Sequence, residues 1–202
     1  MQPTYLVPAL TQPLRFALRR EASWAEGRRH AFEFALEHRD TIAHIREEID
    51  WHEEIMSRPS ATAQGQPYAP NTSVRLHAEG HLKGLRDAFN LLITEGAVES
   101  MERERITAEA RRDAFDFALQ CQGTVENIQA EIQRHEELLS NSSNTSVDNH
   151  TNLRVSAYLS GLTDALKILL QANSNPAQHL ARVAEPRTNP YDVTDAPRQT
   201  RD

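Results

Sequence analysis

The residues with the clearest chemical potential are two pairs of glutamate and histidine, each with the spacing of one helical turn. They are Glu48-x-x-x-His52 and Glu131-x-x-x-His135. Side chains four residues apart on a helix are neighbours, and carboxylate and imidazole groups are ligands for Zn²⁺ and Fe²⁺. If the two pairs faced each other, their four side chains would form a metal site. The alternative is structural, because a histidine on an apolar helix face is usually hydrogen-bonded to a neighbouring glutamate or to a carbonyl.

Two more histidines, His77 and His81, also lie one turn apart. In a second copy of the same segment, described below, their counterparts are Arg154 and Tyr158. A site at these histidines would therefore belong to one copy only. Since they lie near the start of a predicted helix, we expect them to be solvated surface residues rather than metal ligands.

Basic and aromatic side chains are the remaining candidates for contacts with a partner. The pairs Arg28-Arg29 and Arg111-Arg112 could bind a phosphate or an acidic partner. We expect instead that they pair along the helix with acidic residues nearby; these are Glu26, Glu33, Glu109 and Asp116. Trp51 has no aromatic counterpart in the second copy and could mark a partner contact, although partial burial against the loop that follows explains it as well.

Composition argues against several classes of function. The net charge of -7 does not favour binding to nucleic-acid phosphates. Purely apolar runs reach only three residues and no apolar leader opens the sequence, so we expect no membrane segment and a cytoplasmic location, or a virion if the gene belongs to a phage. A single cysteine, Cys121, excludes a cysteine-based zinc site. Because the sequence holds no H-E-x-x-H, no G-x-S-x-G and no glycine-rich phosphate loop, we expect no enzyme activity.

The sequence repeats itself, and the repeat determines the predicted architecture. Residues 20–56 align without a gap onto residues 103–139 at a constant shift of 83 positions, with 18 identities in 37 pairs. Apolar residues recur every three or four positions in both copies, which predicts amphipathic helices over about 23–56, 74–94, 99–139 and 152–172. A polar loop with three prolines separates the two helices of the first copy, and a shorter polar loop without proline separates those of the second.

A second shared pattern lies in the shorter helix of each copy. Small residues recur every four positions and form a flat stripe along the helix; they are Gly80, Gly84 and Ala88 in the first copy and Ala157, Gly161 and Ala165 in the second. Glycine inside a helix costs about 1 kcal/mol relative to alanine. Its presence at the equivalent positions 84 and 161 predicts that another helix packs closely there.

These patterns predict an all-α protein in which two helical hairpins form a four-helix bundle. We divide the chain into an N-terminal arm (1–19), a first hairpin repeat (20–95), a second hairpin repeat (96–172) and a C-terminal tail (173–202). The predicted function is noncatalytic: protein–protein interaction or assembly, with protein partners, a homo-oligomer or a larger complex such as a phage particle. The alternatives are a bundle that binds Zn²⁺ or Fe²⁺ through the Glu–His pairs, and a small regulator that binds an acidic or phosphorylated partner through its arginine pairs.

Overall fold

The computed structural model describes residues 11–57, 73–94, 96–121, 124–142 and 149–174. Within these ranges the protein is entirely helical, which confirms the predicted all-α class. The helices are α1 (Gln12–Glu37), α2 (Ile42–Ser57), α3 (Ser73–Leu91), α4 (Ala97–Gln120), α5 (Val125–Ser142) and α6 (Asn149–Ser174). The expectations for most of the two long loops, for residues 1–10 and for residues 175–202 fall outside the described residues.

Each of the two long predicted helices is broken into two, so the described chain has six helices where four were expected. The carbonyl of Thr41 accepts hydrogen bonds from the N–H groups of His44 and Ile45, at 2.9 and 3.4 Å, and so begins α2. Thr124 does the same in the second repeat, where its carbonyl accepts from the Ile128 N–H at 3.2 Å. Threonine is a poor residue for a helix interior but a favoured one at a helix start.

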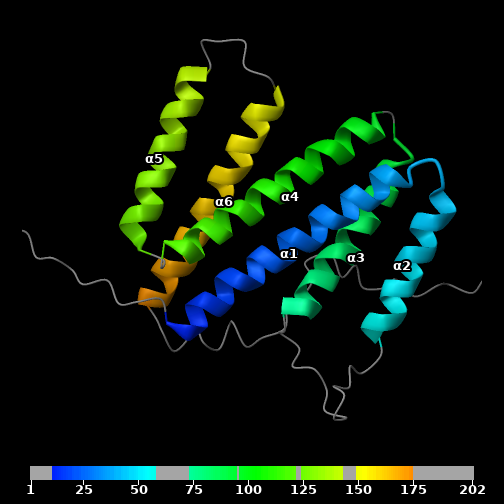
Figure 1. The fold of residues 1–202 in the computed structure, drawn as a ribbon, viewed down its shortest axis with the longest axis horizontal. Helices are drawn as coiled ribbons and strands as arrows, with labels where there is room; N and C mark the ends of the chain where they lie inside the picture. Colours follow the sequence, from blue (N-terminus) through cyan, green and yellow to red (C-terminus); the bar gives the residue numbers. More distant parts are fainter. Residues whose placement is uncertain (1–10, 58–72, 95, 122–123, 143–148, 175–202) are drawn as a thin grey trace, which may run out of the picture.

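The break reverses the chain direction and brings α2 back alongside α3 (Figure 1). A continuous helix would carry Ile45 away from α3, whereas the break buries its side chain completely. Ile42, which the sequence pattern places in the apolar seam, is instead 47% exposed. Hydrophobic burial of Ile45 and its counterpart Ile128 therefore outweighs the hydrogen bonds lost at the break.

The two repeats are arranged around an antiparallel pair of central helices, α1 and α4 (Figure 1). α3 packs on α1 and α6 packs on α4, while α2 and α5 lie outside, against α3 and α6 respectively. Each repeat is therefore a unit of three helices rather than the predicted hairpin of two. The two outer helices are the elements that present the Glu–His pairs.

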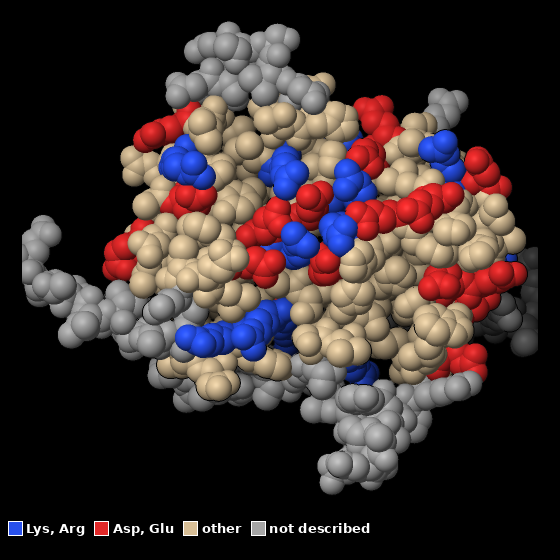
Figure 2. Space-filling view, viewed as in Figure 1, with Lys and Arg blue, Asp and Glu red and all other residues tan. Residues whose placement is uncertain are grey.

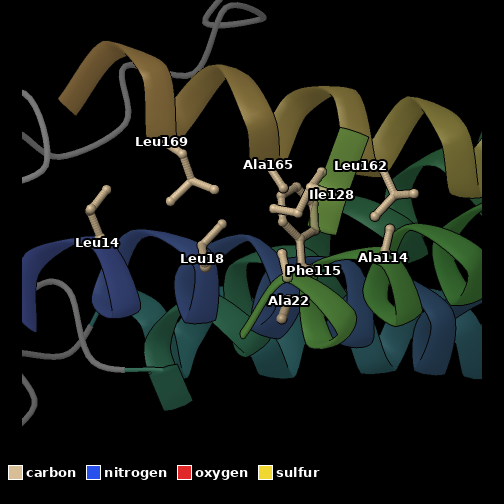
Figure 3. Close-up of a cluster of buried hydrophobic side chains, with 10 residues drawn as sticks. Leu14, Leu18, Ala22, Ala114, Phe115, Ile128, Leu162, Ala165 and Leu169 are labelled. Atoms are coloured by element: carbon tan, nitrogen blue, oxygen red, sulfur yellow. The ribbon is translucent and has the colours of Figure 1, made fainter. Parts of the chain in front are cut away.

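Each repeat has its own hydrophobic core, and each core includes a side chain from the other repeat. The first-repeat core consists of Ala31, Phe32, Ala35, Ile45, Leu85, Ala88 and Met101. The second-repeat core consists of Leu14, Leu18, Ala22, Ala114, Phe115, Ala118, Ile128, Leu162, Ala165 and Leu169 (Figure 3). Met101 comes from α4 and Leu18 comes from α1, and the two occupy equivalent positions of the duplicated sequence. The start of each central helix thus completes the core of the opposite repeat.

The glycines of α1, α3 and α6 allow very close helix packing. A Cβ atom added to Gly84 would lie 2.6 Å from the Ala31 Cβ, and one added to Gly161 would lie 2.7 Å from the Ala114 Cβ. In the first repeat a Cβ on Gly27 would meet the His77 carbonyl oxygen at 2.0 Å, and one on Gly80 would meet the Trp24 carbonyl oxygen at 2.2 Å. The backbones of α1 and α3 therefore touch, which a side chain at these positions would prevent.

Helix α1 begins inside the predicted N-terminal arm. Thr11 precedes it with extended backbone angles, and a proline occupies its first turn, where the missing N–H group is not needed. Leu14 and Leu18 are buried against α6 (Figure 3), so residues 12–19 belong to the folded unit. Gly96 has a left-handed conformation with φ of 74° and is the residue that precedes α4.

Candidate functional site

The two Glu–His pairs do not converge. Glu48 and His52 lie on α2, whereas Glu131 and His135 lie on α5, and these helices are on opposite sides of the α1–α4 pair (Figure 1). The four-residue metal site predicted from the sequence is therefore not formed. The reason is the break in each long helix, which turns α2 and α5 outward onto their own repeats.

Within each pair the histidine has the same geometry. His52 Nδ1 lies 3.0 Å from the backbone carbonyl oxygen of Glu48 and 3.4 Å from its carboxylate. His135 Nδ1 lies at the same two distances from the carbonyl and carboxylate of Glu131. Because a carbonyl can only accept, Nδ1 must carry the proton, which leaves Nε2 of each neutral ring with a free lone pair.

In the first repeat a third side chain joins the pair. His81 on α3 lies with its ring centre 4.6 Å from that of His52. One ligand atom from each of Glu48, His52 and His81 can be chosen so that all three lie within 4.8 Å of one another. His81 was expected at the solvated surface, and its contact with α2 was not predicted from the sequence. The available signal was the difference between the copies, which places a histidine at position 81 and a tyrosine at position 158.

His81 is held in a partly buried environment that keeps it neutral. Burial lowers the pKa of its imidazole to about 4, and the neighbouring His52 and His77 contribute to this shift. Its Nδ1 atom is inaccessible to solvent. A hydrogen bond with the backbone of Gly27 on α1 partly opposes the lowering of the pKa.

In the second repeat Tyr158 stands where His81 stands in the first. Its ring centre lies 4.8 Å from that of His135. Burial and the nearby Glu131 carboxylate raise the pKa of Tyr158 to about 12, so the hydroxyl stays protonated. Hydrogen bonds from Arg134 and from this hydroxyl lower the pKa of Glu131. The second repeat therefore joins α5 to α6 through a hydrogen-bonded network.

A further histidine pair crosses from α1 to α3. His30 Nδ1 lies 2.9 Å from His77 Nε2, and burial followed by the charge of His30 lowers the pKa of His77. At the equivalent positions the second repeat has an ion pair, in which Arg154 donates to Asp113 at 3.1 Å. The first repeat thus has two imidazoles where the second has an ion pair.

The two arginine pairs are engaged within the chain. Arg28 donates to Asp87 and Glu104, both at 3.0 Å, and Arg111 donates to Asp164 at 2.8 Å. Their neighbours in the sequence belong to a chain of ion pairs between α1 and α4, visible in Figure 2 as alternating acidic and basic side chains across the middle of the face. Arg29 pairs with Glu26 and Glu33, and Arg112 with Glu26, Asp113 and Asp116.

Trp51 is on the outer side of α2 and is 53% exposed. Ile55, one turn further along, is also exposed. The surrounding helix is acidic: Glu47, Asp50 and Glu54 lie on the same outward side and are exposed. At the position of Trp51 the second repeat has Arg134, which is paired with Glu131 at 2.8 Å. The second repeat keeps an exposed Leu138 and Glu137 at the positions of Ile55 and Glu54, but it lacks the exposed tryptophan and has Ala130 and Gln133 in place of Glu47 and Asp50.

The start of α1 has the opposite character. Arg15 and Arg19 are exposed on one side of the helix, with the exposed Phe16 beside them. Neither arginine has an acidic partner among the described residues. In Figure 2 basic side chains gather over the start of α1, and acidic side chains gather over α2 on the far side of the same face. The second repeat has Val98 and Glu102 at the positions of Arg15 and Arg19, so this basic patch is also unique.

No model of a known protein family matches the chain, and no curated protein or solved structure matches it significantly. None of the described helices combines the length and apolar character needed to cross a bilayer. Function must therefore be argued from the side chains that the fold brings together.

Proposed function

We propose that the protein is a noncatalytic protein–protein interaction and assembly component, which associates with further copies of itself head to tail. The contact joins the basic patch of one molecule, formed by Arg15, Phe16 and Arg19, to the acidic patch of the next, formed by Glu47, Asp50, Trp51, Glu54 and Ile55. The observation that carries the proposal is that one molecule presents two patches of opposite charge, each of which includes exposed apolar side chains.

The charges decide between a head-to-tail and a symmetric contact. Two copies of α2 facing each other would bring acidic side chains together, and two copies of the start of α1 would bring arginines together. A contact between unlike patches places opposite charges across the interface and can put an arginine over the face of Trp51. The start of α1 and α2, which present the two patches, lie at opposite ends of the molecule (Figure 1), so each molecule can bind two neighbours.

Contacts between unlike surfaces form closed rings or open filaments. This is the geometry from which large assemblies are built, and it suits a structural component of a phage particle as well as a cytoplasmic assembly. We propose accordingly that the protein acts in the cytoplasm, or in the virion if a phage encodes it.

Charge reversal on each patch tests the contact. In one full-length variant, Arg15→Glu and Arg19→Glu make the basic patch acidic; in a second, Glu47→Arg and Glu54→Arg make the acidic patch basic. Light scattering after gel filtration should show association of the wild type that weakens at high salt, because screening reduces surface charge interactions. Each variant alone should be monomeric, and an equal mixture of the two should associate again.

Matched changes in the second repeat serve as the control. Glu137 is the counterpart of Glu54, and Glu137→Arg should leave association unchanged. Wild-type protein that stays monomeric at low salt and high concentration would contradict the proposal. If the wild type associates but the mixture of the two variants does not, another surface makes the contact.

A further inference from the structure

The first repeat contains a set of side chains whose chemistry is that of a metal site. Glu48 and His52 lie one turn apart on α2, and His81 approaches them from α3. One donor atom from each lies within 4.8 Å of the other two. Atoms bound to one Zn²⁺ at about 2.0–2.2 Å are separated by roughly 3–3.5 Å. Small side-chain adjustments therefore bring all three onto a single ion.

The hydrogen bond of His52 prepares it for this role. Its Nδ1–H donates to the Glu48 carbonyl at 3.0 Å, so Nε2 is free to bind a metal. Metal-binding histidines commonly donate their second nitrogen to a carbonyl or a carboxylate in this way, which fixes the ring orientation. The orientation of His52 is thus set without any contribution from the metal.

His81 supplies an independent observation. His81 brings a second imidazole to the site, and the neutral imidazole is the form that binds metals. Its position is fixed by the close approach of α1 and α3, since a Cβ atom on Gly27 would lie 2.8 Å from the His81 backbone nitrogen. His81 is therefore held in place by the packing of the two helices before any ion binds.

The second repeat provides a natural comparison inside the same molecule. Glu131 and His135 repeat the geometry of Glu48 and His52. The third group, however, is the hydroxyl of Tyr158, which is protonated and bonded to Glu131. A protonated phenol is a poor metal ligand, so the second repeat lacks the third donor.

We propose that Glu48, His52 and His81 bind one divalent transition metal ion, with Zn²⁺ bound more tightly than Fe²⁺. Two imidazoles and one carboxylate suit both ions, and zinc binds more tightly to such ligands at equal concentration. Three protein ligands leave a coordination position for water or for a group from another molecule. The metal would connect α2 to α3, as the Tyr158–Glu131 hydrogen bond connects α5 to α6.

Exchange of residues between the repeats tests the site. Zn²⁺ is titrated into chelator-treated, full-length protein by calorimetry, and Co²⁺ absorption reports the coordination geometry. We expect one tight site in the wild type and none in His81→Tyr, with affinity lowered at least about 100-fold, since even the loss of a partner behind a metal ligand costs about 10–100-fold. Tyr158→His should create a second site and raise the stoichiometry from one to two.

If His81→Tyr folds poorly, the second metal site expected in Tyr158→His still tests the proposal. The double exchange, His81→Tyr with Tyr158→His, should bind one ion in the second repeat. Equal binding by the wild type and a folded His81→Tyr variant would overturn the proposal and assign the metal to other histidines. A wild type that binds no Zn²⁺ above the level of exposed histidines would overturn it as well.

Discussion

The two repeats have nearly the same framework but different polar chemistry. Phe32 and Phe115 are both buried, and Gly84 and Gly161 both lie against an alanine of the neighbouring helix. Between the helices, the first repeat has histidines at positions 30, 77 and 81, where the second has Asp113, Arg154 and Tyr158. The framework is therefore retained by packing, and the residues that differ are those available for function.

The repeats also differ in how closely their helices approach. Gly27 and Gly80 of the first repeat correspond to Ala110 and Ala157 of the second, so α1 and α3 pack backbone to backbone while α4 and α6 are separated by methyl groups. The closer approach buries the histidines of α3 against α1. Two missing methyl groups thus create the environment in which the histidine cluster forms.

Removal of the central aromatic side chain tests whether the two cores are equivalent. Phe32→Ala and Phe115→Ala should each lower the free energy of unfolding by about 3–5 kcal/mol, because both leave a large cavity. Urea denaturation followed by circular dichroism should give one transition in both variants, since each core includes a residue from the other repeat. Val74→Ala, at an exposed position, should change stability by about 0.5 kcal/mol or less. Two separate transitions would show that the repeats unfold independently.

Exchange of small residues tests the difference in helix approach. Gly27→Ala places a methyl group against the backbone of α3 and should cost about 3 kcal/mol, as severe overpacking does. The reverse change in the second repeat, Ala110→Gly, should cost only about 1 kcal/mol, the usual penalty of glycine inside a helix. Thermal denaturation measures both variants. Equal losses would mean that α1 and α3 can move apart as easily as α4 and α6.

Acid should weaken the contact between the repeats at Glu26. Burial alone would raise the pKa of this carboxyl group, but the hydrogen bond from Arg29 and the charges of Arg112 and Arg29 lower it to about 2. Because the folded-state pKa lies below the unfolded value of about 4.5, the stabilisation is complete above pH 4.5 and is lost as the pH falls from 4.5 towards 2.

Glu26→Gln should accordingly cost about 1–2 kcal/mol at pH 7, after allowance for solvent screening. The difference from the wild type should shrink as the pH falls to about 3. Urea titrations at several pH values measure this. A difference that stays constant between pH 7 and pH 3 would show that the carboxylate charge has no role.

The ion pairs Arg28–Asp87 and Arg111–Asp164 occupy equivalent positions in the two repeats. Their removal should have the smallest effect on the free energy of unfolding. Asp87→Asn and Asp164→Asn each weaken one arginine contact near the surface and should cost about 1 kcal/mol or less. Arg28 keeps Glu104 as a second acidic partner, whereas Arg111 keeps the Ser160 hydroxyl at 3.1 Å and has no second acidic partner among the described residues. The change at Asp164 should therefore be the larger of the two. Double-mutant cycles with Arg28→Ala and Arg111→Ala measure the coupling energies.

Much of the helix content could be predicted because apolar spacing and small-residue stripes report local geometry. The break between α1 and α2 could not, because the apolar spacing continues through Ala35, His38 and Ile42 without interruption. The competing effect is tertiary: Ile45 is buried only if α2 turns back onto α3. The threonine at the same place in both copies, positions 41 and 124, was the local signal of a helix start.

The candidate site shows the same limit. Glu48 and His52 could be recognised from their spacing, since helix geometry places them together. Their third partner could not, because His81 belongs to another helix and only the packing of α2 on α3 brings it near. The predicted convergence with Glu131 and His135 assumed one straight helix per repeat and failed when that assumption failed.

Leu18 and Met101 are each buried in the opposite repeat, so the peptide link from α3 to α4 is not what holds the two halves together. A protease cut in that link leaves two fragments whose apolar side chains remain inserted in each other. A fragment that contains only the first repeat has a cavity in its core where the Met101 side chain lies in the intact protein. A second copy of this fragment can fill the cavity with its own Leu18. Two identical fragments can therefore form a symmetric dimer in which each supplies Leu18 to the core of the other.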